Sequence, residues 1–446
     1  MPPSTRSIVA SIRGYYLGWW RYDKETEKRV EEALERDYWT ESEWEKWQQN
    51  RLSVVLHRAA NQVPFYREIW AKRRRDGDRS SYEYLENWHI LEKSAVRRHG
   101  KDLVADDCNA KTMYRDRTSG TTGTSLDIWM TRETARYWYA LAEARWRRWY
   151  GVSKNDRWAI LGGQLVTPIR QTQPPFWVWN AGLNQLYMSS YHLAPSHLSY
   201  YVKALKKYRI RYILGYPSSL YSLAQAVKTE NIKDIRLEVV ITNAEPLYQH
   251  QKELISDAFG CPVRETYGMA EMVAAGSECT SGNLHQWLDA GVIESEGNEG
   301  SGQPHEFICS GLINPDMPLI RYRVGDAGTF SSESCGCGRT LPVITQIEGR
   351  NDDLLYTADG SRVGRLDPVF KDTFGIAEAQ IIQRSLQEIC VKYVPGITFE
   401  KTVELKIAGR IRERMGDVTV TFENVSRIPR SAAGKFRAVV CELEGK

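Results

Sequence analysis

Three short apolar segments, each followed by small polar residues and then by a helix-compatible stretch, constrain the fold of this chain most strongly. They are residues 157–161, 212–214 and 237–242, and the small polar residues after them are Gly162 and Gly163, residues 215–219, and residues 243–246. After the third segment a helical pattern runs through Ile255 and stops at Gly260, a residue type that often terminates helices. Repeated strand–helix units of this kind predict an α/β fold, with a largely parallel sheet and helices on its faces. Ligands of such sheets bind at the carboxyl ends of the strands, where these polar residues fall.

The chain is long enough for two or more domains, since it has 446 residues of which 42% are hydrophobic and 26% are charged. Residues 24–75 carry Glu, Lys, Arg, Trp and Leu at helical spacings, and we expect a helical opening over about residues 1–110. From Val292 onward the pattern changes to shorter strands and more turns, with strands expected at 401–407 and 418–422. We therefore expect a large N-terminal domain over residues 1–350 and a small, mobile α+β C-terminal domain over residues 351–446.

Composition excludes several classes of protein. The formal net charge of +4 does not require a nucleic-acid partner. Neither a signal peptide nor a run of roughly 18 apolar residues is apparent, so we expect a cytoplasmic protein without a membrane span. The aromatic segment 14–20 could rest on a membrane or a partner, although packing against the protein is the interpretation that we favour. The oligomeric state is open, with a homodimer as one option.

Residues 118–125, Thr-Ser-Gly-Thr-Thr-Gly-Thr-Ser, place hydroxyl groups and glycines in one turn. Such a turn can surround a phosphate, because glycine lets the backbone approach an anion and the N–H and O–H groups donate hydrogen bonds. The segment lacks the Gly-Lys-Ser/Thr ending of a Walker loop, which disfavours an ordinary P-loop NTPase. A polar surface loop is the alternative interpretation.

Five further motifs follow this loop in order along the chain. They are Asn-Ala-Glu-Pro at 243–246, Tyr-Gly-Met-Ala-Glu at 267–271, Arg-Tyr-Arg-Val-Gly-Asp at 321–326, Gly-Arg-Asn-Asp-Asp at 349–353 and Arg-Ser-Ala-Ala-Gly-Lys at 430–435. The series resembles the adenylate-forming enzymes, and most closely the branch of phenylacetate–CoA ligases and CapK-type proteins. The resemblance extends over roughly residues 50 to 440, with ordinary domain lengths throughout.

The resemblance implies that ATP binds with its β- and γ-phosphates at the hydroxyl-rich loop. The loop residues concerned are Thr118, Ser119, Gly120, Thr121, Thr122 and Gly123, and hydroxyl donors such as that of Thr122 would stabilise the charge on the leaving pyrophosphate. Many relatives end this loop with Pro-Lys, whereas this chain has Ser125 and Leu126. We expect the missing cation to weaken phosphate binding or to slow closure of the loop.

The remaining nucleotide contacts are implied by the other motifs. The segment of Asn243, Ala244, Glu245 and Pro246 would lie along the adenine base, on which the Tyr267 ring stacks while Gly268 permits close approach. Glu271 would hold Mg²⁺ through oxygen ligands and so take part in catalysis. Asp326 would bind the ribose hydroxyls, and the guanidinium of Arg350 would approach the sugar and the phosphate.

The last two motifs imply a moving domain. Asp352 or Asp353 matches the hinge about which the small domain swings. Lys435 resembles a lysine that contacts both the substrate carboxylate and the α-phosphate, where an ammonium group neutralises two anions that would otherwise repel. We therefore expect Lys435 to be catalytic.

The acyl pocket is expected near the ends of the parallel strands. Its predicted residues are Gly163, Gln164, Tyr216 and Met269. Nearby aromatic residues at 176, 177 and 179 favour an aryl or otherwise apolar acid, although they could equally belong to the core.

Eight cysteines in a chain of this size do not make a disulfide scaffold, and four residues form a candidate metal site. Cys335 and Cys337 form a knuckle-like turn, and Cys279 and His285 lie in another turn-rich stretch. Three thiolates and one imidazole suit a closed, structural Zn²⁺ site, and related CapK-type proteins resemble this chain in such a cluster. Buried free thiols with an unrelated histidine are the alternative.

By resemblance, this chain is an AMP-forming acid ligase that uses Mg·ATP to convert a small carboxylic acid into its acyl-adenylate with release of pyrophosphate. Coenzyme A is the default acyl acceptor. An amide or ester ligase that transfers the acyl group to an amine or a sugar is the second interpretation. A noncatalytic nucleotide-binding module is a remote third one, because the chain retains Glu271, Asp326, Arg350 and Lys435.

Overall fold

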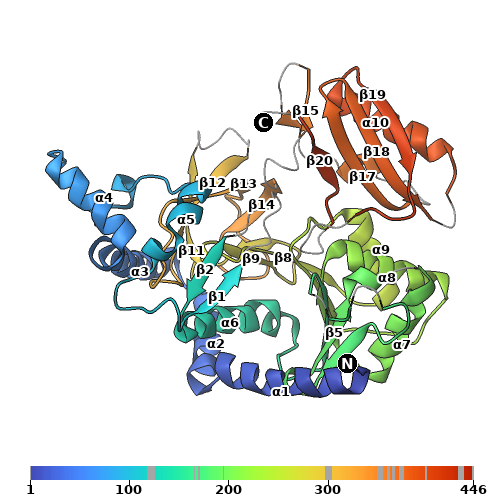
Figure 1. The fold of residues 1–446 in the computed structure, drawn as a ribbon, viewed down its shortest axis with the longest axis horizontal. Coiled ribbons are helices and arrows are strands. Elements are labelled where there is room, and N and C mark those ends of the chain that lie inside the picture. The colour runs from blue at the N-terminus through green and yellow to red at the C-terminus, as the bar shows by residue number, and fades with distance from the viewer. Residues whose placement is uncertain are drawn as a thin grey trace.

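The structure is a computed structural model. It describes residues 2–117, 126–164, 166–168, 171–193, 195–296, 304–348, 355–358, 362–363, 367–370, 376–396, 399–429 and 436–443. The architecture is α/β, with a large sheet surrounded by helices and a smaller sheet near the C-terminus (Figure 1). No helix within these residues has the length and apolarity needed to cross a membrane.

Helices dominate the first hundred residues, in line with the expected helical opening. They are α1 (Pro3–Arg21), α2 (Lys24–Arg36), α3 (Glu41–Gln62), α4 (Pro64–Arg75), η1 (Leu85–Asn87), α5 (Lys93–His99) and η2 (Gly100–Leu103). The side chains of Asp23 and Thr40 accept hydrogen bonds from the backbone of the first turns of α2 and α3, and both caps are reciprocal capping boxes. Pro64 stands at the first position of α4, where its missing N–H costs nothing.

Twelve strands form the large sheet. In spatial order they are β11 (Gly291–Glu296), β12 (His305–Gly311), β13 (Tyr322–Phe330), β14 (Val343–Glu348), β10 (Leu284–Gln286), β9 (Ala275–Glu278), β8 (Val263–Gly268), β7 (Val239–Thr242), β6 (Tyr212–Gly215), β3 (Trp158–Gly162), β5 (Gln185–Ser189) and β4 (Trp177–Asn180). The five strands β5, β3, β6, β7 and β8 run parallel, whereas the pairs from β8 to β11 and the β4–β5 pair are antiparallel. The sheet is therefore mixed, and the predicted strands at 157–161, 212–214 and 237–242 lie in its parallel half.

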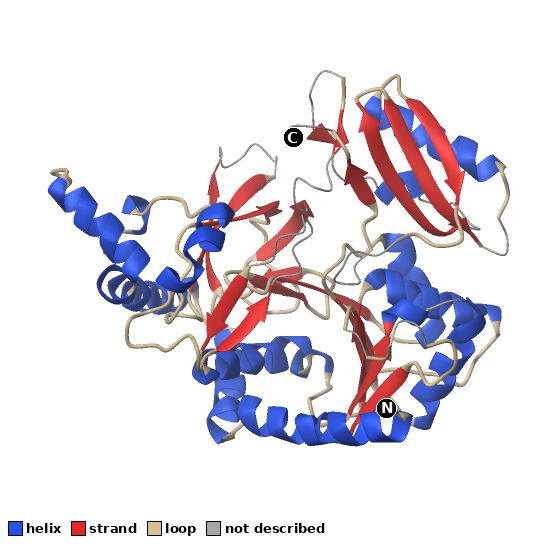
Figure 2. Cartoon of the chain, viewed as in Figure 1, coloured by secondary structure: helices blue, strands red, loops and turns tan. Residues whose placement is uncertain are grey.

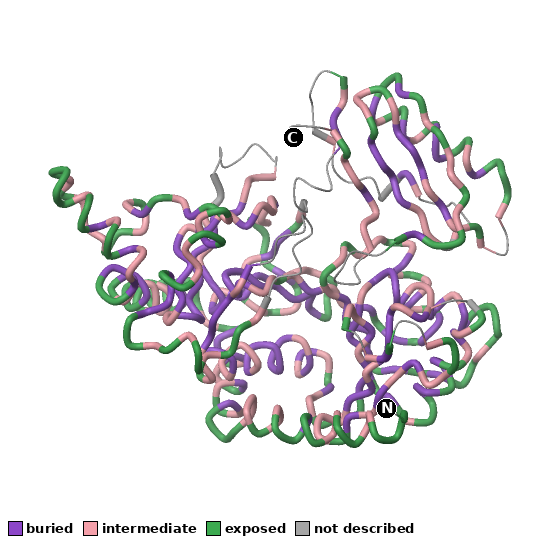
Figure 3. The backbone as a smooth tube through the Cα atoms, in the orientation of Figure 1, coloured by how far each residue is buried: buried purple, intermediate pink, exposed green. Residues whose placement is uncertain are grey.

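Helices pack against this parallel half, as Figure 2 shows. They are α7 (Leu198–Lys207), α8 (Pro217–Thr229) and α9 (Gln249–Phe259), with the short turns η4 (Ala181–Leu183), η5 (Ser190–His192) and η6 (Pro195–His197) between strands and helices. Their apolar faces and the strands form one buried cluster that includes Leu161, Ile213, Leu220 and Phe259. Buried backbone follows the sheet and the inner faces of the helices in Figure 3. Gly260 ends α9 with a φ of 62°, as the sequence predicts.

A two-stranded ribbon and one long helix complete the large domain. The ribbon pairs β1 (Tyr114–Arg117) with β2 (Asp127–Met130), and it leads into α6 (Arg132–Trp146) and η3 (Arg148–Tyr150). Arg145 of α6 is fully buried, and its guanidinium lies 2.9 Å from Asp37 and 2.6 Å from Asp289. These carboxylates keep Arg145 charged and raise its pKa. The buried ion cluster fixes α6 against α2.

The C-terminal sheet has four strands, in the order β19 (Thr419–Asn424), β18 (Glu388–Pro395), β17 (Ile376–Ser385) and β20 (Val439–Cys441). The strands β15 (Leu355–Tyr356) and β16 (Arg362–Val363) pair separately, and η8 (Asp367–Phe370) lies between these strands and β17. The expected strand at 401–407 is wrong, because this segment begins α10 (Thr402–Met415). Val403, Ile407, Ile411 and Met415 are spaced by four residues, and this spacing buries one face of a helix. The proposed domain boundary at 350 stays a prediction.

Candidate active site

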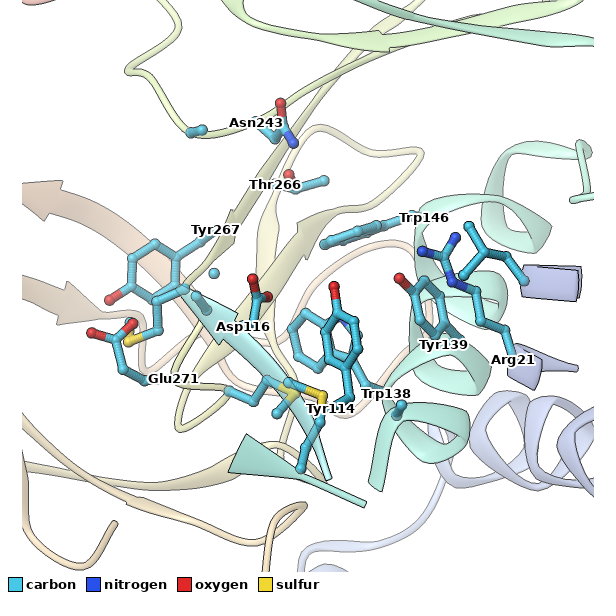
Figure 4. Close-up of a pocket in the computed structure, with 18 of the residues that line it drawn as sticks. Arg21, Tyr114, Asp116, Trp138, Tyr139, Trp146, Asn243, Thr266, Tyr267 and Glu271 are labelled. Atoms are coloured by element: carbon cyan, nitrogen blue, oxygen red, sulfur yellow. The ribbon is translucent and has the colours of Figure 1, made fainter. Parts of the chain in front are cut away.

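A cavity of about 780 Å³ lies beside the carboxyl-terminal ends of β7 and β8. Its walls come from α1, β1, α6, the loop after β7, the end of β8 and the segment after it, β13, and Phe436 and Arg437 before β20 (Figure 4). The cavity therefore collects residues from both ends of the chain. It also contains the described parts of three of the sequence motifs, at 243–246, 267–271 and 326.

Tyr267, Asp326 and Glu271 form the polar end of the cavity. The Tyr267 hydroxyl donates a 2.8 Å hydrogen bond to Oδ2 of Asp326, although 58 residues separate them along the chain. Glu271 is 4% exposed, and its Oε1 accepts a 3.1 Å hydrogen bond from the hydroxyl of Tyr322. An aromatic ring and two carboxylates of fixed orientation thus face the same space. Such a set suits a base, a diol and a hard cation.

The loop after β7 and the segment after β8 each contain a residue with a strained backbone conformation. Ala244 has a φ of 65°, and Met272, directly after Glu271, has a φ of 54°. Non-glycine residues in the left-handed region are uncommon, cost about 1–3 kcal/mol each and cluster at functional sites. Both residues line the cavity, next in sequence to Asn243 and Glu271.

Glu245 connects the large domain to the C-terminal segment. Its Oε1 accepts a 2.7 Å hydrogen bond from the backbone N–H of Phe436, and its Oε2 accepts a 3.1 Å bond from the backbone N–H of Ser218. Ser218 belongs to the first turn of α8, where an anion is favoured by the helix dipole. The carboxylate of Glu245 therefore supports the cavity wall through backbone contacts.

Some predicted site residues lie outside the residues that the structure describes. They are Thr118, Ser119, Gly120, Thr121, Thr122, Gly123, Arg350, Asp352, Asp353 and Lys435. The predicted phosphate loop joins β1 and β2, and Tyr114 and Asp116 of β1 and Met130 of β2 line the cavity. Phe436, the next residue after Lys435, also lines it.

Of the four residues predicted for the acyl pocket, the structure places one in the wall of this cavity. Met269 lines the cavity, whereas Gly163, Gln164 and Tyr216 do not. The carbonyl of Gly163 instead accepts a hydrogen bond of 2.9 Å from the Tyr191 hydroxyl. An acyl role for these three residues stays a prediction.

Sequence reasoning missed a group of aromatic and basic residues that line the opposite end of the cavity. They are Arg13, Tyr16, Trp20, Arg21, Tyr114, Trp138, Tyr139 and Trp146. Within α1 and α6 their spacing is helical, so the sequence could have indicated an aromatic helix face. It could not have indicated that both helices line the same cavity.

Glu265 is a buried carboxyl group in the cavity wall. Burial and the neighbouring Glu278 raise its pKa to about 7, although Lys252 and a backbone hydrogen bond from Leu247 oppose this rise. Glu278 itself is held by Lys252 at 2.8 Å and by Arg264 at 3.0 Å. Glu265 therefore titrates near neutral pH.

The four residues of the candidate metal site come together away from this cavity. The ligand atoms of Cys279, His285, Cys335 and Cys337 all lie within 4.8 Å of one another. The Sγ atoms of Cys279 and Cys335 are 3.6 Å apart, and Sγ of Cys337 lies 3.4 Å from Nε2 of His285. The four groups belong to two segments, residues 279–285 and 335–337, that are fifty positions apart in the sequence, as a cross-linking metal site requires.

Neighbouring groups orient these ligands. Nδ1 of His285 lies 2.7 Å from the carbonyl oxygen of Leu341, a contact that makes Nδ1 the protonated nitrogen and leaves Nε2 free to bind a metal. Nδ2 of Asn283 lies 3.1 Å from Sγ of Cys335. Burial alone would raise the pKa of the Cys335 thiol, but hydrogen bonds from Asn283, Cys337 and His285 lower it to about 6. The donor set and the thiolate character fit zinc.

Comparison with known proteins identifies the family. The AMP-binding enzyme family matches residues 45–297, more than half of the chain, and the CapK C-terminal domain matches residues 355–442. The chain belongs to the AMP-binding enzyme family. It is an AMP-forming ligase that activates an acid as its adenylate.

Two curated proteins are similar to this chain over most of its length. Protein CapK of Staphylococcus aureus is 26% identical over 458 residues, which cover 98% of this chain and 97% of CapK. A phenylacetate-coenzyme A ligase of Pseudomonas putida is 24% identical over 329 residues, which cover 69% of this chain and 71% of the ligase. The predicted resemblance to the phenylacetate–CoA ligase and CapK branch of AMP-binding enzymes is confirmed.

Solved structures share the fold. A 2-hydroxyisobutyryl-CoA ligase in the postadenylation state, in complex with R3-HIB-AMP, has a TM-score of 0.70 and 21% identity, with 92% of both chains covered. The same ligase in the thioesterification state has a TM-score of 0.55 over the same coverage. The chain therefore shares the fold of this ligase.

Proposed function

We propose that this enzyme adenylates a small carboxylic acid with Mg·ATP and then transfers the acyl group to coenzyme A. One observation carries the proposal: Tyr267, Asp326 and Glu271 face one cavity together with the Asn243–Pro246 segment. A carboxylate oxygen of the acid attacks the α-phosphorus of ATP, and the bond to the bridging oxygen of pyrophosphate breaks. The thiol of coenzyme A then attacks the acyl carbon, and AMP leaves.

The described residues suit the nucleotide in specific ways. The Tyr267 ring would stack on adenine, and the hydrogen bond from its hydroxyl would orient the Asp326 carboxylate toward the two ribose hydroxyls. Glu271, oriented by Tyr322, would supply an oxygen ligand to Mg²⁺. Bound Mg²⁺ would neutralise charge on the phosphates during transfer.

Lys435 is proposed as the residue that neutralises the reacting carboxylate and the α-phosphate. The support comes from its neighbours, since Phe436 and Arg437 line the cavity and Phe436 is hydrogen bonded to Glu245. A cation near two anions lowers the cost of bringing them within reacting distance. The proposed hinge at Asp352 or Asp353 would later carry this segment away, which would open a path for the acceptor.

An ATP–pyrophosphate exchange assay over a panel of aryl and aliphatic carboxylic acids tests the adenylation step. We expect acid-dependent exchange, and we expect Glu271→Gln and Lys435→Ala to reduce it by at least about 100-fold, as for other groups that act on developing charge. Lys401→Ala, a change at the start of the C-terminal helix region, is the matched control. Lack of exchange with every acid would contradict the proposal.

Mass analysis of the products decides the acyl acceptor. Adenylated acid is offered coenzyme A, an amine panel and a sugar panel in separate reactions. A thioester is the expected product. An amide or sugar ester in its place would assign the enzyme to the second class of ligase considered from the sequence.

We also propose that Cys279, His285, Cys335 and Cys337 hold a structural zinc ion that ties the two loops together. All four positions of a tetrahedral site would be filled by protein, which leaves none for a substrate. Cys335→Ser is expected to lower the zinc content of the purified protein from about one ion per chain by more than half. Cys108→Ser, at a thiol outside the cluster, should leave it unchanged. Equal zinc content in both variants would contradict the four-ligand site.

A further inference from the structure

The cavity wall opposite Glu271 is formed by one face of α1. Arg13, Tyr16, Leu17, Trp20 and Arg21 all line it, at spacings of three or four residues along the helix. Gly14 faces the opposite side, where an added Cβ would collide with the Asn180 side chain. The helix is thus fixed with its basic and aromatic residues toward the cavity.

Among the residues that the structure describes, no carboxylate forms an ion pair with the guanidinium of Arg21. It lies over the ring of Tyr139, with its central carbon 4.4 Å from the ring centroid, and Figure 4 shows it at the cavity wall. Its Nε atom is buried without a hydrogen-bond partner, and among the described residues its guanidinium makes neither a hydrogen bond nor an ion pair. Stacking uses only one face of the group, so the N–H donors along its edge stay available. Because a buried donor is stabilised by a hydrogen-bond acceptor, the Arg21 guanidinium is suited to bind an anionic group.

Aromatic rings line the cavity between Arg21 and the end formed by Tyr267, Glu271 and Asp326. Trp20 and Tyr114 lie with their ring centroids 5.6 Å apart, and Trp138 and Trp146 meet edge to face at 5.9 Å. All four residues line the cavity. These walls suit a planar, apolar body with its reacting end toward Tyr267 and its other end toward Arg21.

The described carboxylates of the cavity wall do not neutralise Arg21. Asp116, Glu245, Glu265, Glu271 and Asp326 line the cavity, and none forms an ion pair with Arg21. Figure 4 places Glu271 beside Tyr267 and Asp116 between Tyr267 and Tyr114, both apart from Arg21. The Arg21 end is therefore the basic end of the cavity, reinforced by Arg13.

We infer that the substrate is an aromatic acid with a second anionic group, remote from the reacting carboxylate, and that Arg21 binds this group. The inference rests on the proposed adenylation and names its substrate class. The remote carboxylate accepts hydrogen bonds from the guanidinium edge, which makes Arg21 a specificity-determining residue. A charge-assisted, bidentate contact of this kind gives large selectivity for acids that carry the remote anionic group over acids that lack it.

The test compares acids that differ only at the remote end. Phenylacetate and 4-carboxyphenylacetate form one pair, and biphenyl-4-acetate and 4′-carboxybiphenyl-4-acetate form a longer pair. ATP–pyrophosphate exchange gives kcat/KM for each acid with the wild-type enzyme, Arg21→Met and Arg21→Lys. We expect the wild type to prefer the diacid of at least one pair by about 10- to 100-fold, the range of a hydrogen bond to a charged group. Arg21→Met should abolish the preference for the diacid by raising its KM. Arg21→Lys, which keeps a positive charge, should retain part of this preference.

Arg132→Met is the matched control, because Arg132 also stacks on an aromatic ring, that of Trp19, but does not line the cavity. It should affect both acids of a pair alike. Equal use of both acids by the wild type, or equal losses for both acids in Arg21→Met, would overturn the inference while leaving adenylation intact.

Calorimetric titration of the diacids without ATP gives an independent readout: binding to the wild type that weakens in Arg21→Met supports the inference, and equal binding contradicts it. Absence of exchange with every acid would instead contradict the proposed function.

Discussion

At the scale of single residues, the hydrogen bond from Tyr267 to Asp326 links the proposed adenine and ribose contacts. The ring and the carboxylate come from different strands, β8 and β13, and the 2.8 Å bond fixes their relative orientation. A carboxylate that is oriented before the ligand arrives loses less entropy when it binds. Affinity for the nucleotide should therefore depend on the tyrosine hydroxyl as well as on the ring.

Tyr267→Phe should raise the Kd for ATP by about 10-fold, the loss of one hydrogen bond to a charged group, while the ring still stacks. Equilibrium binding of a fluorescent ATP analogue measures the change. Tyr393→Phe is the matched control, because its hydroxyl also donates to a carboxylate, that of Glu404 at 2.6 Å, but lies outside the cavity. Equal affinities of Tyr267→Phe and the wild type would contradict the assigned contact.

Glu265 should make the stability of the protein depend on pH near neutrality. Its pKa is about 7 in the folded state against 4.5 for the free group, so the folded state binds more protons between these values. Stability contributed by the protonated form is therefore lost as the pH rises from about 4.5 to about 7, by at most about 3 kcal/mol. Urea unfolding at pH 5 and pH 8 measures this loss.

The loss of unfolding free energy between pH 5 and pH 8 should be smaller in Glu265→Gln than in the wild type, since a neutral amide does not ionise in this pH range. Glu413→Gln, at an exposed side chain, should keep the pH dependence of the wild type. If Glu265→Gln and the wild type lose the same free energy of unfolding between the two pH values, the buried carboxyl is not the cause.

Residues in short motifs were predictable from the sequence, and residues that act through the tertiary fold were not. Tyr267, Glu271 and Asp326 were identified by their motifs, and the structure brings all three to one cavity. Arg21 and Trp138 carry no motif, because their positions in the wall result from the packing of whole helices. The same limit applies to Gly163, which follows a predicted strand but lies outside the cavity.

At the scale of elements, α1 packs very closely on η4. An added Cβ at Gly182 of η4 would lie 2.5 Å from the carbonyl carbon of Gly14 and 2.8 Å from the carbonyl oxygen of Ser11. These are backbone atoms, so a side chain cannot rotate away to make room. The helix would have to move.

Gly182→Ala should therefore loosen α1 and expose Arg13 and Arg21 to trypsin. Limited proteolysis with mass analysis of the fragments measures cleavage at these arginines, which we expect to rise by about 10-fold, as for a local loss of roughly 1.4 kcal/mol. Gly409→Ala is the control, because nothing lies within 4 Å of a Cβ at that position. Unchanged cleavage in Gly182→Ala would show that the contact does not hold α1.

Elements were predictable where one periodicity dominated. The segment 237–242 is apolar and bounded by polar residues, and its last four residues form the fully buried strand β7. The segment 401–407 is short and has no such boundary, so it resembled a strand when taken alone. Its helical repeat becomes visible only when Ile411 and Met415 are included. The antiparallel half of the sheet was not predictable, because strand direction depends on pairing between distant segments.

At the scale of the whole molecule, the C-terminal segment already contacts the large domain. The 2.7 Å hydrogen bond from Phe436 to Glu245 joins residues separated by 191 positions, beside the proposed adenine contacts. The described residues Phe436 and Arg437 thus form part of the wall of the same cavity as Tyr267.

The central claim is that a carboxylate oxygen of the acid attacks the α-phosphorus of ATP. Transfer of ¹⁸O from a doubly labelled carboxylic acid tests it most directly. After one turnover with acid, ATP and coenzyme A, one labelled oxygen should appear in AMP, because the acyl–oxygen bond breaks in the second step while the phosphorus–oxygen bond persists. Label in inorganic phosphate, or no label in any phosphate product, would contradict adenylation.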